Sequence, residues 1–299
     1  KVMAEIQQLP QEVADQISAG EVIERPASVV KELIENSIDA DSNKILVEVE
    51  NGGKDKIRVK DDGGGIKGEQ LQLAFSRYAT SKIDDINDIY SLHTLGFRGE
   101  ALASIASVAK VKVTTKHKKA VKGNKIIIKG SKVIEEVTAA SPQGTDIIVT
   151  DLFYNTPARF KYMKTTNTEF GHISDIVINE ALAYPDINFT LKHNQKQVLN
   201  TPGTGKLKDS IYEIYGKELA NNLLPIDFKD KFIKVSGFIA KPNFSRSSRI
   251  YEKFFVNQRA IKNSTISYAV EEAYQGLLPP KKYPIVFLNI KLNPILVDV

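Results

Sequence analysis

The amino-acid sequence predicts an α+β fold, an α/β sandwich in which helices cover one face of a mostly antiparallel sheet, followed by a smaller α/β domain. Alternating apolar residues mark strands in the first half of the chain, and segments with helical periodicity lie between them. The sequence Thr-Pro-Gly-Thr-Gly at 201–205 then interrupts both patterns. Because 299 residues suit two cores better than one, we expect domains at 1–203 and 204–299.

The elements of the first domain follow in order from these patterns. Residues 11–19 and 26–40 have helical periodicity. Residues 44–50 and 56–61 alternate as strands, and the Asn51-Gly52-Gly53 link between them predicts a hairpin. The same patterns predict strands at 111–115, 125–129, 133–138 and 145–151, and helices at 69–75 and 100–108.

Fewer elements are expected in the second domain. A helix near 206–215 follows the break, and strands are expected near 231–240, 251–256 and 284–291. A helix at 264–275 lies between the last two strands. This set is sufficient for a small α/β domain.

Composition excludes several kinds of site. The chain has no cysteine, which excludes disulfides, thiolate metal sites and cysteine nucleophiles. The formal net charge of +5 permits contact with nucleic acid without demonstrating it. The longest apolar runs, such as 126–128 and 147–149, are far too short to span a bilayer, and residues 1–10 lack the order of a signal peptide. We therefore expect a cytoplasmic protein that does not contact a membrane.

The helix expected at 26–40 carries a first candidate constellation. Glu32 and Asn36 are four residues apart and lie on one helix face, with Asp39 close to the same line. A carboxylate can take a proton from an attacking water, and an amide oxygen can ligate Mg²⁺. Because this spacing is common, a solvated acidic face is the alternative interpretation.

A second constellation follows the strand at 56–61. Asp61 ends that strand, and Gly63, Gly64 and Gly65 come directly after it. The carboxylate can accept a hydrogen bond from an exocyclic amine such as that of adenine, and glycines let the backbone approach a flat ring. The alternative is an ordinary tight turn, since aspartate and glycine are common turn residues.

A third constellation is a glycine loop that enters a helix. Gly96 and Gly99 bracket the loop, and good helix formers begin at Glu100. Free backbone N–H groups at such a helix start form an anion site that suits phosphates. The sequence is neither a Walker A motif nor a G-x-G-x-x-G fingerprint, and a capped surface loop is the alternative. Upstream residues that are candidates for a lid over the same phosphates are Arg77, Thr80, Ser81 and Lys82.

Taken in order, these pieces resemble a known set of motifs. Four short segments are similar to the four motifs of the GHKL ATPases, namely Glu32-x-x-x-Asn36, Asp61-x-Gly63-x-Gly65, Gly96-x-x-Gly99 and Gly144-Thr145. Within that superfamily, DNA gyrase and the ninety-kilodalton heat-shock chaperones match at single motifs only. Longer strings resemble the MutL-type DNA mismatch repair proteins, namely residues 17–40, 79–82, 95–105 and 151–159.

The resemblance implies a role for each matching residue in a Mg²⁺-dependent ATPase. Glu32 would activate the hydrolytic water, Asn36 would hold Mg²⁺, and Asp61 would bind the adenine amine. Gly65 would shape the adenine pocket, and Thr145 would support it. The residues implied at the phosphates and the lid are Thr80, Ser81, Lys82, Gly96, Phe97, Arg98, Gly99, Glu100, Ala101 and Leu102.

The resemblance also implies a fold and partners. The first domain would be a Bergerat-type GHKL sandwich, and the second would be a transducer-like domain that resembles part of a ribosomal protein. An ATP-dependent homodimer would form, with residues 1–23 crossing to the partner. Arg259 would contact DNA independently of base sequence, and salt would weaken that contact. Further partners would be a MutS-type mismatch recognition protein and a downstream nuclease or helicase.

Two departures from the family pattern concern particular positions. The family text at Val297-Asp298-Val299 continues to a lysine that reaches the γ-phosphate, and this lysine is not among the 299 residues. Hydrolysis and ATP-driven dimerisation are therefore expected to be impaired. The family often has glycine where this chain has Gln258, which leaves the shape of that loop open.

Two other functions compete with a MutL-type ATPase. One is a DNA-binding scaffold with a decayed nucleotide pocket, which the intact Glu32, Asn36 and Asp61 disfavour. The other is a different GHKL protein, a topoisomerase subunit or a protein kinase. No phosphoacceptor histidine hairpin is evident, and the longer MutL-type strings disfavour a topoisomerase.

Overall fold

The computed structural model describes residues 10–80 and 99–293. Contacts between residues divide this part of the chain into two compact units. The first takes in residues 10–80, 99–174 and 192–196, and the second the remaining described residues from 175 onward. Residues 1–9, Ser81, Lys82, Gly96, Phe97 and Arg98 lie outside the described part, and the boundary near residue 203 stays a prediction.

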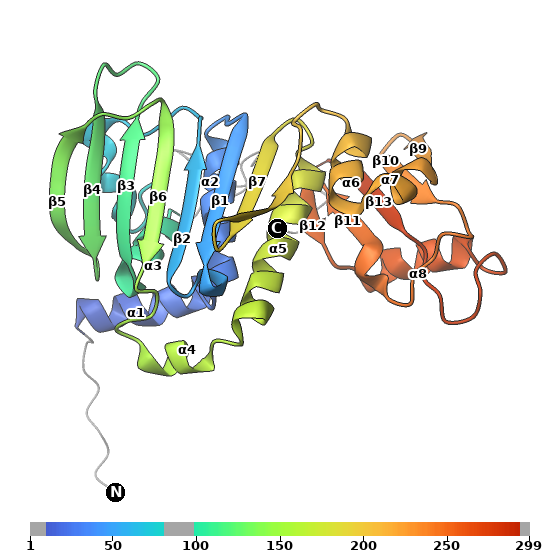
Figure 1. Ribbon diagram of the computed structural model, residues 1–299, viewed down its shortest axis with the longest axis horizontal. Helices are drawn as coiled ribbons and strands as arrows, with labels where there is room; N and C mark the ends of the chain where they lie inside the picture. The colour runs from blue at the N-terminus through green and yellow to red at the C-terminus, as the bar shows by residue number, and fades with distance from the viewer. Residues whose placement is uncertain (1–9, 81–98, 294–299) are drawn as a thin grey trace, which may run out of the picture. The chain divides into compact units, whose positions relative to one another are not determined.

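An eight-stranded sheet is the largest element (Figure 1). Its strand order is β5-β4-β3-β6-β2-β1-β7-β8. The strands are β1 (Lys44–Glu50), β2 (Lys56–Asp61), β3 (Lys110–Lys116), β4 (Gly123–Lys129), β5 (Lys132–Ala139), β6 (Gly144–Thr150), β7 (Asn188–His193) and β8 (Lys196–Asn200). The pairs β1–β2, β2–β6, β6–β3, β3–β4 and β4–β5 are all antiparallel, as the sequence predicted.

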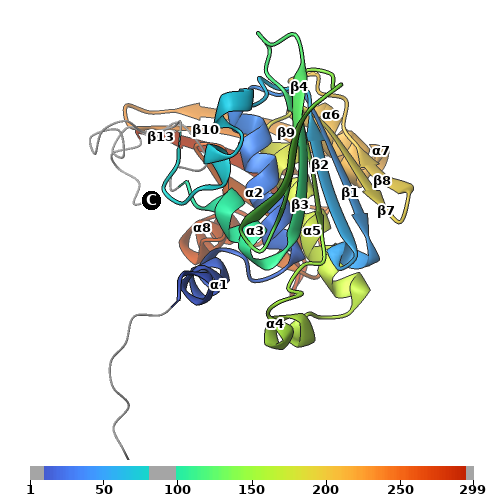
Figure 2. The same cartoon turned by 90° about the vertical axis from the view of Figure 1, so that its left-hand side faces the viewer.

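Helices cover one face of this sheet (Figure 2). Helix α2 (Pro26–Asp39) packs against β1 and β2, helix α3 (Ala101–Val108) packs against β3 and β4, and helix α1 (Gln11–Val22) packs against α3. The alternation that puts Val47 and Val59 on the helix side buries both side chains. Val30 and Leu33 of α2 lie on the side of the helix that faces the sheet and are also buried.

The second unit contains a five-stranded sheet in the order β12-β11-β13-β10-β9. Its elements are α6 (Leu207–Tyr215), α7 (Lys217–Asn221), β9 (Leu223–Lys229), β10 (Ile233–Ala240), β11 (Glu252–Val256), β12 (Arg259–Ile261), α8 (Ser264–Ala273) and β13 (Val286–Leu292). Successive residues of β11 supply two separate apolar clusters, since Phe255 packs with Phe287 and Phe254 packs with Leu288. Two further helices, α4 (Pro157–Tyr162) and α5 (Thr166–Ala183), follow β6.

The helix predicted at 69–75 is wrong. Two short 3₁₀ turns, η2 (Gly68–Gln70) and η3 (Leu73–Phe75), occupy this segment instead. Leu71 is fully buried while Leu73 is 57% exposed, so the chain turns around one buried side chain and presents no continuous apolar face. Within the described residues, no helix is long and apolar enough to cross a membrane.

Candidate functional site

A buried carboxylate lies at the end of β2. Asp61 is only 8% exposed. Its Oδ1 accepts hydrogen bonds from the backbone N–H groups of Gly63 at 2.9 Å and Thr145 at 3.1 Å. Ser37 Oγ lies 3.0 Å from Oδ2 and donates to it. The carboxylate therefore joins α2, the loop after β2 and the first residues of β6.

The electrostatics of this carboxylate favour a donor ligand. Burial raises the pKa of Asp61, and hydrogen bonds from Gly63, Ser37 and Thr145 offset part of that rise. An ionised carboxylate offers about four lone-pair directions. Because Ser37 Oγ also lies 3.0 Å from the Leu33 carbonyl oxygen, its proton can move there and leave Oδ2 to accept from an amine of a bound base.

Two glycines let the surrounding backbone pack closely. Gly65 has φ +67°, and a Cβ there would overlap the carbonyl oxygen of Lys116. Gly144 has φ +106°, and a Cβ there would overlap the carbonyl oxygen of Asp61. A side chain at either position would push the loop after β2 away from β3 or β6. Gly65 thus lets the loop after β2 pack directly on β3, and its role in an adenine pocket stays a prediction.

Thr115 is a site residue that sequence reasoning missed. Its side chain is fully buried, and its Oγ1 accepts the N–H of Ile66 at 2.9 Å. The same hydroxyl donates to the Gly144 carbonyl at 3.0 Å and lies 3.1 Å from Thr145 Oγ1. The signal was present, because the alternation that buries Val113 places Thr115 on the same face of β3.

Helix α2 carries the first constellation. Glu32, Asn36 and Asp39 are partly exposed, whereas Leu33 is buried against the sheet. Glu32 and Asn36 each have an interaction partner in the structure. Ser37 comes directly after Asn36, so the helix that presents Glu32 and Asn36 also donates to Asp61.

The third constellation is described only at its edges. Gly99 has φ +63°, and a Cβ there would collide with the backbone of Ala79. The described residues Ala79 and Gly99, which flank the undescribed segment, therefore lie side by side. Helix α3 starts immediately after them, where Glu100, Ala101 and Leu102 are partly exposed.

Two arginines, Arg77 and Arg159, hold helix α1 in place. Arg77 forms an ion pair with Asp15 at 3.0 Å and donates to Ser18 Oγ at 3.2 Å. Arg159 donates to the Gln16 carbonyl at 2.9 Å. Helix α1 is therefore tied both to the residues just before Thr80 and to helix α4 after β6.

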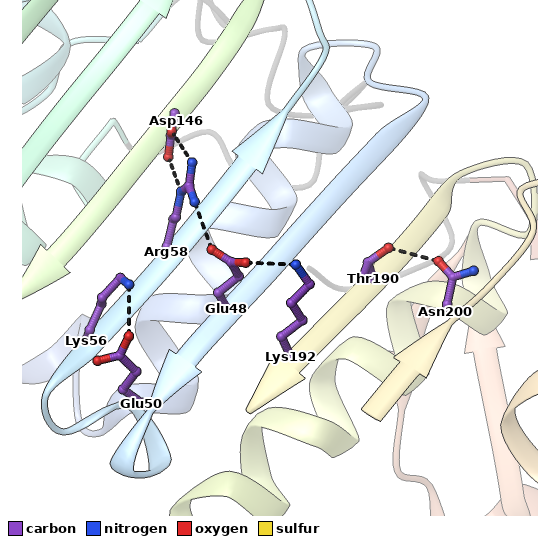
Figure 3. A network of polar contacts seen from close by, with 8 residues as sticks. All are labelled: Glu48, Glu50, Lys56, Arg58, Asp146, Thr190, Lys192 and Asn200. Atoms are coloured by element: carbon purple, nitrogen blue, oxygen red, sulfur yellow. Dashed lines mark hydrogen bonds and ion pairs between the residues drawn. The ribbon is translucent and has the colours of Figure 1, made fainter. Parts of the chain in front are cut away.

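On the face of the eight-stranded sheet that helices α2 and α3 do not cover, charged side chains form a ladder of ion pairs (Figure 3). Arg58 is 2.8 Å from both Asp146 and Glu48, and Lys192 is 3.1 Å from Glu48. Hydrogen bonding to Asp146 and Glu48 raises the pKa of Arg58. Because these cations already pair with carboxylates across four strands, this ladder adds no unpaired positive charge that would attract a phosphate backbone.

Arg259 lies in the second unit, at the start of β12, and is partly exposed. The turn before it contains Asn257 and Gln258 at φ +47° and +68°. Asn257 Oδ1 accepts the N–H of Leu292 at 3.0 Å. The loop therefore keeps the two-residue left-handed shape that suits glycine, although Gln258 occupies the second position.

The described side chains near Asp61 and on α2 do not form a protein-only metal cage. In residues 10–80 and 99–293, no group of three histidine, cysteine, aspartate or glutamate side chains is placed to hold a metal ion. A metal at α2 would thus depend on single oxygen donors such as Asn36, together with oxygens of a ligand and water.

Comparisons with known proteins agree with this geometry. Residues 23–152 match the family model of histidine kinase-, DNA gyrase B- and HSP90-like ATPases. Residues 211–299 match the model of the DNA mismatch repair protein C-terminal domain. The DNA mismatch repair protein MutL of Halothermothrix orenii is 64% identical over 99% of this chain and 46% of its own length. MutL of Geobacillus thermodenitrificans is 48% identical over the same shares.

Solved structures give the same result. The N-terminal domain of a DNA repair protein superposes with a TM-score of 0.82 and 27% identity, over 96% of this chain and 89% of that one. The Aquifex aeolicus MutL ATPase domain complexed with ADP has a TM-score of 0.71 and 27% identity, over 91% and 94%. The chain spans about half the length of the curated relatives it matches.

Proposed function

The chain belongs to the MutL family of DNA mismatch repair proteins, and from that premise we propose that its first unit is a slow, Mg²⁺-dependent ATPase. The observation that supports this most directly is the environment of Asp61. The buried carboxylate is fixed by Gly63 and Thr145, and Ser37 can donate instead to the Leu33 carbonyl, which would leave Oδ2 to accept from a ligand amine. Adenine presents such an amine at the edge of its ring, whereas guanine presents a carbonyl oxygen there.

The remaining residues divide the chemistry between them. Glu32 takes a proton from the attacking water as a general base. Gly99, Glu100, Ala101 and Leu102 present backbone N–H groups at the start of α3 to the phosphates. A lid segment would exclude water from the phosphates and so complete the site. This segment contains Ser81, Lys82, Gly96, Phe97 and Arg98, and Thr80 comes directly before it.

Asn36 suits Mg²⁺ because its amide oxygen is a hard donor on a partly exposed helix face. When bound, Mg²⁺ neutralises the charge that develops on phosphate oxygens. Asn36 would hold the ion one helical turn from Glu32, on the same face of the helix.

Nucleotide state would control assembly. ATP would favour a homodimer, and docking of α1 through Arg77 and Arg159 offers a route by which the lid edge influences the N-terminal segment. The dimer would act on DNA in the cytoplasm through Arg259, together with a MutS-type recognition protein and a downstream nuclease or helicase. Contacts with DNA phosphates would weaken as salt rises.

The test is binding of ATP and of an unhydrolysable analogue with and without Mg²⁺, with phosphate release followed in parallel. We expect the wild-type chain to bind and the Asp61→Asn variant to lose binding. Asp227→Asn, an exposed aspartate on β9, serves as the control and should bind normally. Failure of the wild-type chain to bind either nucleotide would refute the ATPase and favour a DNA-binding scaffold.

A further inference from the structure

Thr115 connects two parts of the candidate adenine pocket that are distant in sequence. Its hydroxyl accepts from Ile66 N–H, at the end of the glycine loop after Asp61. It also donates to the carbonyl of Gly144 and lies within hydrogen-bonding distance of Thr145 Oγ1. With an exposed fraction of 0%, Thr115 cannot touch a ligand itself.

The glycine loop, residues 63–65, packs against the end of β3. Lys118 N–H donates to the Gly64 carbonyl at 3.0 Å. Gly65 packs directly on the backbone of Lys116, where no side chain would fit. The Thr115 hydroxyl extends this support to β6, because it is also hydrogen-bonded to the Gly144 carbonyl.

We propose that Thr115 is a positioning residue for base recognition, which fixes the Gly65 loop and the Thr145 backbone so that Asp61 presents its acceptor to the adenine amine. This inference rests on the proposed ATPase function. Thr145 N–H is one of the donors that orient Asp61, and Thr115 is hydrogen-bonded to the residue before Thr145. Loss of the Thr115 hydroxyl would leave Ile66 N–H without this acceptor and let both segments shift.

A positioning role makes a selective prediction, because Thr115 serves the base end of the pocket. Its loss should weaken the contact between Asp61 and the amine more than contacts with phosphates. The suitable probes are ATP and the same triphosphate built on unsubstituted purine, which lacks the 6-amino group. Wild-type protein should bind ATP more tightly than the purine analogue.

The variants are Thr115→Val, which keeps the shape of the side chain and removes the hydroxyl, and Thr115→Ser, which keeps the hydroxyl. Thr114→Val is the matched control, since it makes the same change at the preceding, partly exposed position of β3. We expect Thr115→Val to weaken ATP binding about tenfold, as for an unpaired buried polar group, with a much smaller effect on the purine analogue. Thr115→Ser and Thr114→Val should keep the wild-type ratio of the two affinities.

Equal weakening of both nucleotides by Thr115→Val, or no weakening of either, would overturn the inference. If Thr115→Val gives no cooperative thermal transition, Thr115→Ser and Thr115→Ala make the same comparison, because they differ by one hydroxyl. If Thr115→Ser and Thr115→Ala have the same ratio of ATP affinity to purine-analogue affinity, the inference is also overturned. A wild-type chain that does not bind ATP refutes the proposed function itself, which separates the two failures.

Discussion

Ser37 Oγ lies 3.0 Å from Asp61 Oδ2 and joins helix α2 to the carboxylate at the end of β2. The same hydroxyl lies 3.0 Å from the Leu33 carbonyl oxygen. A hydroxyl carries one proton and donates to one acceptor at a time. When a ligand amine donates to Asp61, the serine proton has a second acceptor within reach, so ligand binding leaves neither group unpaired.

Replacing Asp61 with asparagine should separate binding from stability. The amide keeps the shape and one oxygen acceptor, but its NH₂ group would face the ligand amine. We expect ATP affinity to fall by about 100-fold or more. Isothermal titration of wild-type and variant protein measures this loss.

The stability of the Asp61→Asn variant should move the other way. Burial raises the pKa of Asp61, so stability from the protonated carboxyl is fully present below pH 3.8 and is lost as pH rises through the raised pKa. At neutral pH the variant buries no charge. It should therefore resist urea at least as well as the wild-type chain, and a parallel loss of stability and binding would contradict this expectation.

Replacing Glu32 with glutamine should stop hydrolysis without preventing binding. The amide is isosteric but cannot accept a proton from water, so we expect phosphate release to fall by about 10²–10⁴-fold with little change in ATP affinity. Glu35→Gln is the control on the same helix, because Glu35 forms an i,i+4 ion pair with Lys31 at 3.2 Å. Loss of hydrolysis in both variants would assign the effect to helix α2 as a whole and not to a general base.

Sequence patterns located those elements in which local periodicity and burial agree. The predicted bounds of β1 and β2 match the structure because both strands alternate cleanly between buried and less buried residues. Helix α5 was missed, although Ile173, Val177 and Ala181 recur every four residues and are fully buried. Polar residues and Gly171 hid that stripe, since they have low helix propensity.

The site was predictable to a similar extent. Asp61 and Thr145 could be identified from short motifs, and the structure places them in direct contact. The contributions of Thr115 and Ser37 were not predicted, because each depends on a partner far along the chain. Thr115 and Ile66 are 49 residues apart, and the pairing of β6 with both β2 and β3 brings the loop and the strand together.

His193 should make the stability of the first unit depend on pH. Its Nε2 accepts the Gly52 N–H at 3.3 Å, and its ring stacks on Phe170 with a centroid separation of 3.9 Å. Burial lowers the pKa of His193. The neutral ring is favoured in the folded state, so stability should be complete above the ordinary value of 6.5 and fall as pH drops below it, where the unfolded chain takes up the proton first.

Urea unfolding between about pH 8 and about pH 5.5 measures this effect. His193→Gln keeps an acceptor for Gly52 and removes the titrating group, so its stability should depend less on pH than that of the wild-type chain. His172→Gln, on helix α5, is the control and should retain the wild-type profile. Identical profiles for all three proteins would contradict the role assigned to His193.

Replacing Gln258 with glycine should stabilise the second unit. Gln258 has φ +68°, in the left-handed region that costs about 1–2 kcal/mol for a residue with a side chain. Glycine adopts this conformation freely but loses more entropy on folding, so we expect a net gain of up to about 1 kcal/mol.

The hairpin between β7 and β8 provides an internal replicate. Asn194 and Gln195 have φ +47° and +68°, the same values as Asn257 and Gln258. Gln195→Gly should therefore give a gain of similar size, and the two gains should add in the double variant if the turns are independent. Gln258→Ala shortens the side chain but retains its Cβ, so a gain as large as that of glycine would show that side-chain contacts, and not the backbone conformation, limit stability at this turn.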